Sequence, residues 1–284
     1  PAGGINPFDM VTSWPWLSWG LIIPSAIGLL LMLKPVRRLV ARFTKLDPGH
    51  PVHTVALGLT MMPFILLAFT LSVGLGALAA QMTTESDRTG APPVTLLALW
   101  AQTAMFLLSA LVGVGWLTRR SFSATLARLG IVKPTLREVL IGIGAALALV
   151  PTVMILETVF RNLGFGVSQD VESLTEALTG PLFSTPLGII SIGLAAAIGE
   201  EPIFRGAAQP RFGLLITAAL FALVHSQYGL SLATLIVFGL GLVLGILRMR
   251  FNTTTSIITH AVYNSSLGVL FVVAQSALTA AEQS

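Results

Sequence analysis

Eight apolar stretches constrain this chain more than any other feature, because most are long enough to form a membrane-spanning helix. A helix needs about 20 mostly apolar residues to cross a bilayer. Charged residues make up only 10% of the 284 residues, against about 25% in soluble domains, and so cannot cover a soluble surface. The chain is therefore predicted to be an all-α, polytopic membrane protein. The eight expected transmembrane helices lie near residues 14–33, 54–80, 94–117, 137–160, 186–208, 213–227, 230–248 and 255–276.

Basic residues are distributed unevenly between the loops that connect these helices. The even-numbered loops carry only Arg88 and Arg161, and Arg205 lies inside the fifth span. Loops rich in Lys and Arg stay in the cytoplasm, so the odd-numbered loops are predicted inside and both termini outside. This placement accounts for the net charge of +4 without a nucleic-acid partner. The odd-numbered loops carry Lys34, Arg37, Arg38, Arg42, Lys45, Arg119, Arg120, Arg128, Lys133, Arg137, Arg211, Arg248 and Arg250.

Three regions are expected along the chain. Residues 1–136 hold the first three helices and a basic cytoplasmic loop, residues 137–276 form the core with the polar residues described next, and residues 277–284 are a tail. The longest outer loop, 161–185, is predicted to contain a short interfacial helix capped by Ser168 or Asp170. The absence of cysteine excludes a thiol nucleophile and cysteine-ligated metal centres.

Ionisable side chains inside membrane spans are costly and therefore mark functional sites by default. They gather in the second half of the chain, as Glu200, Glu201, Arg205, His225 and His260, together with the amide of Asn264. Glu201 and Arg205 are four residues apart and are predicted to form an ion pair on one helix. Adjacent helical residues point in different directions, so Glu200 is left free for chemistry. Pro202 lacks an N–H and predicts a kink at 198–202.

The same residue types suit the hydrolysis of an amide bond. A carboxylate such as Glu200 beside His225 can hold a water and take its proton. His260 and Asn264 share one face of the last helix and can donate hydrogen bonds to an oxyanion. A zinc ion held by Glu200, His225 and His260 is an alternative that these residues leave open. The sequence contains neither G-x-S-x-G nor HExxH.

The order of these motifs resembles the CAAX protease and bacteriocin-processing family, also called the Abi family, which includes the type II CAAX prenyl proteases. The matching segments read EEPIFR at 200–205, FALVH at 221–225 and HAVYN at 260–264. The Phe238-x-x-Gly241-x-x-x-Gly245 stretch is similar to a small-residue element of the family. The resemblance covers about residues 137–276, and its glycines are expected to serve close helix packing.

The resemblance implies an eight-helix bundle with an intramembrane cavity and an intramembrane endopeptidase activity. Glu200 and His225 would activate the water, His260 and Asn264 would form the oxyanion hole, and Glu201 and Arg205 would support the site. The expected partners are the lipid bilayer and a membrane-associated peptide or protein substrate, which is lipidated in the namesake CAAX case. The expected location is the cell membrane, with the site in the cytoplasmic half of the bilayer and without a cofactor. A non-proteolytic scaffold or immunity protein on the same fold is the alternative of another class.

Overall fold

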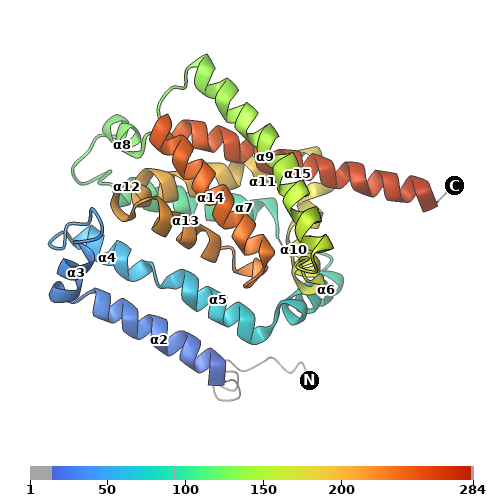
Figure 1. Ribbon diagram of the computed structural model, residues 1–284, viewed down its shortest axis with the longest axis horizontal. Coiled ribbons are helices and arrows are strands. Elements are labelled where there is room, and N and C mark those ends of the chain that lie inside the picture. Colours follow the sequence, from blue (N-terminus) through green and yellow to red (C-terminus); the bar gives the residue numbers. More distant parts are fainter. Residues whose placement is uncertain (1–14, 93, 283–284) are drawn as a thin grey trace.

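The computed structural model describes residues 15–92 and 94–282. Every regular element within these ranges is a helix, which confirms the predicted all-α fold class (Figure 1). The first helices are α2 (Pro15–Leu31), α3 (Lys34–Val40), α4 (Pro51–Leu59), α5 (Met62–Val73), α6 (Leu75–Thr89), α7 (Leu96–Gly113), α8 (Phe122–Leu129), α9 (Leu136–Asn162) and α10 (Gln169–Phe183). They are followed by α11 (Pro186–Glu201), the π-helical η1 (Pro202–Ala208), α12 (Gln209–Phe212), α13 (Leu214–Leu223), the 3-10 turn η2 (Ser226–Tyr228), α14 (Leu232–Arg250) and α15 (Thr253–Glu282).

Several of these helices are long and apolar enough to cross a membrane, which confirms a multi-pass membrane protein. A further span arises if α2 and α3, which are bent by 90° relative to each other, are counted together. The predicted sixth span contains only the short helix α13, whose 10 residues rise about 15 Å, half the thickness of the hydrocarbon core. The described residues thus hold six spans, or seven with the bent pair, rather than eight. The six are Pro51–Val73, Leu96–Gly113, Leu136–Asn162, Pro186–Phe212, Leu232–Arg250 and Thr253–Ala281.

The predicted second span, 54–80, was wrong at its C-terminal end. The span ends at Val73 because Gly74 takes a φ of +88°, a backbone conformation that residues other than glycine rarely adopt. The chain then starts α6, whose second half is polar and carries an exposed ion pair between Arg88 and Glu85. Helix α6 packs against α10 (Figure 1). The helix predicted in the outer loop is α10, which begins after Ser168, but the Ser168 side chain makes no capping hydrogen bond.

The helices that carry the intramembrane polar residues form the centre of the bundle. Helix α15 packs against α11 and α9, α13 packs against α14, and α7 covers another side of α11. Helices α2 and α5 lie together at one edge, and the C-terminal part of α15 extends beyond the other helices (Figure 1). The N-terminal helices join the core through a small apolar cluster of Leu46, Leu57 and Phe212.

The contact between α11 and α15 depends on Gly193. A Cβ atom added there would lie 2.3 Å from the Ser265 hydroxyl and 2.8 Å from the Ala261 carbonyl oxygen. We expect Gly193→Ala to force the helices apart and to lower the free energy of unfolding by about 1–3 kcal/mol, measured by thermal melting in detergent. Gly144→Ala in α9 is the matched control, because nothing lies within 4 Å of its added Cβ and alanine favours the helix. Equal melting of the two variants would contradict the packing argument.

Candidate active site

The polar segment of the fifth predicted span begins where α11 changes its helical form. Pro202 has no N–H to donate to the carbonyl four residues earlier, and the chain continues as the π-helical segment Pro202–Ala208. The predicted kink at 198–202 is therefore replaced by a π-helical turn that begins at Pro202, within one continuous span, Pro186–Phe212. Single π-helical turns are frequent at functional sites, and this one carries Arg205 toward the acidic pair that precedes it.

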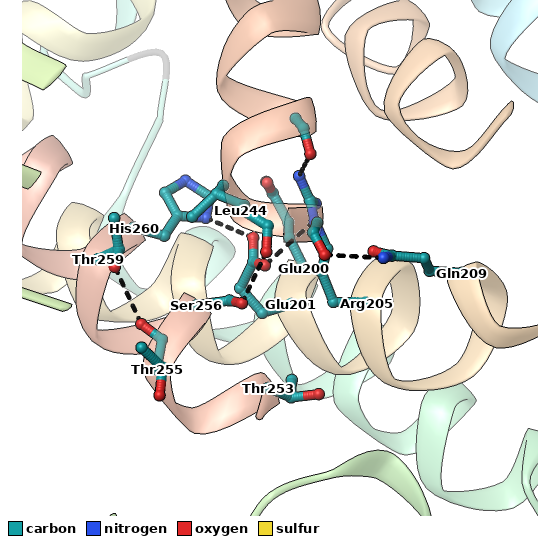
Figure 2. A network of polar contacts seen from close by, with 12 residues as sticks. Glu200, Glu201, Arg205, Gln209, Leu244, Thr253, Thr255, Ser256, Thr259 and His260 are labelled. Carbon is teal, nitrogen blue, oxygen red and sulfur yellow. Dashed lines mark hydrogen bonds and ion pairs between the residues drawn. The ribbon is translucent and has the colours of Figure 1, made fainter. Parts of the chain in front are cut away.

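Glu201 lies at the centre of a fully buried polar network. One of its carboxylate oxygens is 2.8 Å from His260 Nδ1, and the other is 3.3 Å from Arg205 Nε. Figure 2 shows the carboxylate between these two partners, which approach from α15 and from η1. The side chains of Glu201, His260 and Arg205 are 0%, 3% and 1% exposed, respectively. The ion pair predicted between Glu201 and Arg205 is present, and it is extended by a contact to His260 that the sequence did not predict.

Arg205 is held on three sides. Besides the Glu201 carboxylate, it donates through Nη2 to the Gly241 carbonyl at 3.4 Å. Its guanidinium carbon lies 4.0 Å from the centre of the Phe221 ring, a cation–π contact that strengthens when it is desolvated. The predicted small-residue element of α14 thus lies against the site, and a Cβ on Gly241 would come within 3.3 Å of Ala218 and Phe221.

Glu200 faces His225 rather than the Arg205 and His260 side chains that contact Glu201. Glu200 Oε2 lies 4.0 Å from His225 Nε2, and the two side chains are 14% and 20% exposed. This distance exceeds a direct hydrogen bond, and Glu200 Oε2 is buried without a hydrogen-bond partner among the described residues. A water between the two atoms would satisfy both. The pair is more accessible than Glu201, which is fully buried.

The tautomers of the two histidines follow from their partners. His225 Nδ1 lies 2.8 Å from the Phe221 carbonyl oxygen, which only accepts, so Nδ1 donates and Nε2 is an acceptor in the neutral ring. His260 Nδ1 faces the Glu201 carboxylate, so it also donates. His260 Nε2 can donate as well only when the ring is protonated, and the ring then forms an ion pair with Glu201.

Phe221 connects the two halves of this site, which sequence reasoning did not foresee. Its buried ring lies 4.9 Å from the His225 ring and 6.0 Å from the His260 ring, centroid to centroid. Tyr228 stacks on His225 from η2, at 6.1 Å and an interplanar angle of 2°. The position of Phe221 four residues before His225 was the available signal, since Phe221 lies on the last turn of α13 and His225 follows just after the helix.

Asn264 lies on α15 one turn beyond His260 and is partly buried. Its side chain makes no hydrogen bond to any other residue in the described ranges. A partly buried amide in an apolar span that is bonded to nothing is costly, and it stays available to a substrate. The structure thus places Asn264 on the same helix as His260, without a hydrogen bond from its side chain to the other described residues.

The three donors named for the zinc alternative, Glu200, His225 and His260, are not grouped as a metal site among the described residues. No group of three or more His, Asp or Glu side chains in the described part of the chain is arranged to hold a metal ion. The Nδ1 atom of His225 faces a carbonyl and that of His260 faces Glu201. Each histidine would therefore bind zinc through Nε2, which is the usual arrangement for a histidine ligand whose other ring nitrogen is hydrogen-bonded.

The comparison with family models supports the identity suggested by the motifs. Residues 182–266 match the model described as type II CAAX prenyl endopeptidase Rce1-like. No curated protein and no solved structure matches the chain. The matched segment includes 85 of the 284 residues and leaves out α2 to α9. The predicted resemblance to the CAAX protease family is therefore confirmed over residues 182–266, which carry all six candidate side chains.

Proposed function

We propose that this protein is an intramembrane endopeptidase of the CAAX protease type that hydrolyses a peptide bond with a water activated by Glu200 and His225. The observation that carries the proposal is the Glu200–His225 pair, whose facing atoms are 4.0 Å apart in an apolar bundle. The matching family is a family of endopeptidases. The proposal is tested by incubating the purified protein with prenylated and unprenylated peptides and identifying the cleaved bond by mass spectrometry.

The water would donate one hydrogen bond to the Glu200 carboxylate and one to His225 Nε2. Both atoms are acceptors, so the lone pairs of the water oxygen point away from them toward a substrate carbonyl. Glu200 takes the proton as the oxygen attacks, and it can later deliver the proton to the leaving amine. The bond from His225 Nδ1 to the Phe221 carbonyl keeps the ring in the tautomer that this step needs.

The oxyanion that forms on the substrate would be stabilised from α15. His260 Nε2, with its ring protonated, and the Asn264 amide are the two donors, and preorganised donors of this kind supply a large part of catalysis. Glu201 would orient His260 through Nδ1, and Arg205 would hold Glu201 in turn. Glu201 and Arg205 are positioning residues in this scheme because neither can reach the substrate from a fully buried position.

The proposal needs no metal ion, and the chemistry of the donors supports that choice. The carboxylate, the two histidines and the amide already provide a base, a water site and oxyanion donors. Dialysis against a chelator, followed by metal analysis and a cleavage assay, distinguishes the zinc-dependent mechanism from the metal-free one. We expect cleavage to survive; loss on chelation with recovery on adding zinc would establish the metal mechanism instead.

The proposed location is the cell membrane, with the active site in its cytoplasmic half. The uneven charge of the loops supports this orientation. It puts both termini outside when the bent α2–α3 pair and the short helix α13 both complete a crossing. The partners are the bilayer and a membrane-associated peptide or protein that reaches the site from lipid or cytoplasm. Comparing a prenylated peptide with the same peptide lacking the lipid shows whether the substrate must be lipidated.

Asn264→Ala should lower kcat by about 10²–10³, the usual effect of removing one oxyanion donor in a soluble protease. The donor acts mainly in the transition state, so KM should change much less. Asn264→Asp keeps the size but puts an acceptor beside the developing oxyanion, and it should be at least as damaging. The measurement is kcat per folded molecule, with the folded fraction taken from gel filtration. A near wild-type kcat in folded Asn264→Ala would remove this residue from the site.

A further inference from the structure

A cavity of about 660 Å³ lies at the end of the bundle where α12 and α14 finish. It is lined by the loop after α3, by the end of the π-helical span and by the last turn of α14. Five of the lining side chains are cationic and none is acidic. The five are Arg42, Lys45, Arg205, Arg211 and Arg248.

Three of these guanidinium groups have buried nitrogens that lack a partner. Within residues 15–92 and 94–282, Nη1 of Arg205 and Nε of Arg211 and Arg248 have no hydrogen-bond acceptor. Arg205 itself is 1% exposed, so water cannot compensate freely. Leaving a buried charged donor unpaired costs more than leaving a neutral one. A ligand that supplies several acceptor oxygens would remove this cost.

The positive charge around the cavity is not balanced by neighbouring acids. Arg205 is paired with Glu201, whereas no ion pair involves the other four cations in the described part of the chain. The excess of positive charge also acts on Arg128 in the adjacent helix α8. Burial, followed by the charge of Arg211, lowers the pKa of the Arg128 guanidinium. The cavity therefore favours an anion of more than one charge.

We propose that this cavity binds the phosphate-bearing headgroup of an anionic membrane lipid. Guanidinium groups match phosphate oxygens with paired hydrogen bonds, and basic pockets between transmembrane helices suit such headgroups. The lining also includes Phe43 and Met249, which are 81% and 63% exposed. Apolar rim residues beside a cationic floor correspond to the boundary between acyl chains and headgroups, which a soluble phosphate would not need.

The bound lipid would strengthen the junction between the N-terminal helices and the core. The Lys45 N–H donates to the Arg211 carbonyl at 2.8 Å, and Arg211 Nη1 donates back to the Lys45 carbonyl at 3.4 Å. The cluster of Leu46, Leu57 and Phe212 lies next to this contact. Because the headgroup would contact Lys45 and Arg211 together, its binding should raise the melting temperature of the whole chain.

The test uses the full chain, purified in detergent, stripped of lipid and titrated with cardiolipin, phosphatidylglycerol or phosphatidylcholine. Native mass spectrometry counts the retained lipid, and thermal melting follows stability. We expect one tightly retained cardiolipin, weaker phosphatidylglycerol and no specific phosphatidylcholine. The double variant Arg211→Gln/Arg248→Gln should weaken cardiolipin binding by about 10²- to 10⁴-fold, since each of the two lost charge-assisted bonds contributes about 1.5–3 kcal/mol.

The matched control is Arg137→Gln/Arg250→Gln, which removes the same charge from exposed positions at the same end of the molecule that do not line the cavity. It should bind cardiolipin as the wild type does. If Arg211→Gln/Arg248→Gln fails to fold, Arg42→Gln/Lys45→Gln, whose side chains are exposed on a loop, serves the same purpose. Equal cardiolipin retention by the cavity and control variants would overturn the proposal.

Two further titrations separate the sources of the anion. Pyrophosphate that binds as tightly as cardiolipin would replace the lipid by a soluble phosphate and overturn the lipid assignment. A peptide with a free C-terminal carboxylate that displaces the lipid, while its amidated form does not, would assign the cavity to a peptide instead. Failure of both to compete with cardiolipin supports the proposal. These readouts do not depend on proteolysis, so they stand apart from the proposed enzymatic function.

Discussion

Glu200→Gln should lower the rate of peptide cleavage by about 10²–10⁴-fold, the range that general acid–base catalysis contributes. Glutamine keeps the size and the acceptor oxygen of the side chain but cannot take the proton of the attacking water. The fold should survive, because Glu200 forms no ion pair other than the 4.0 Å contact with His225 within the described ranges. The measurement is kcat on a peptide that the wild type cleaves, together with thermal melting in detergent.

The control for this variant is Glu157→Gln in α9. Glu157 is also a partly buried carboxylate within a span and forms an ion pair with neither His225 nor His260, so its replacement removes the same charge and should leave cleavage unchanged. A Glu200→Gln enzyme that keeps a tenth of the wild-type rate would show that another group takes the proton. A Glu200→Ala protein that keeps full biological function would favour the non-proteolytic scaffold over the enzyme.

The helical architecture and the members of the candidate site could be read from the sequence because both depend on local composition. Apolar length alone predicts a span, and charged side chains within a span stand out against it. Phe221 and His260 lie in the predicted motifs on α13 and α15, and His225 lies just after the end of α13. The ion pair of Glu201 with Arg205 also followed from local spacing, since it needs only one helix.

The contacts between helices could not be predicted in the same way. His260 pairs with Glu201 only because α15 crosses α11 at a particular register, and Gly193 is what lets the two backbones approach. A register between helices 59 residues apart in sequence is set by packing, which no local pattern reports. The cationic cavity escaped prediction for the same reason, because its lining extends from Arg42 to Met249.

The local backbone conformation at Pro202 and at Gly74 was also not predicted correctly from the sequence. Pro202 signals a disturbed helix, but a kink and a π-helical turn both accommodate the missing N–H, and the chain adopts the second. Gly74 lies in an apolar run that reads as one continuous span. Only its positive φ ends the span early, and the chain then continues as α6, which packs against α10.

Glu201→Gln should lower the free energy of unfolding by about 3–5 kcal/mol, the cost of stranding one partner of a buried pair in soluble proteins. The carboxylate is fully buried and faces both Arg205 and His260, so a neutral amide leaves the guanidinium without its counter-charge. Expression, gel filtration and thermal melting measure the loss. Glu157→Gln again serves as the matched control, and normal melting of Glu201→Gln would show that the pair does not stabilise the fold.

The double variant Glu201→Gln/Arg205→Met distinguishes a structural from a positioning role. Replacing a whole buried pair by groups without charge is often neutral, so the double variant should recover much of the stability lost in Glu201→Gln, as a positive coupling in a double-mutant cycle. Its activity should stay low, because His260 Nδ1 then faces an amide that can no longer form an ion pair with the protonated ring. Recovery of both stability and kcat would mean that Glu201 supports the fold alone. Recovery of stability without kcat would establish that Glu201 positions His260 for the reaction.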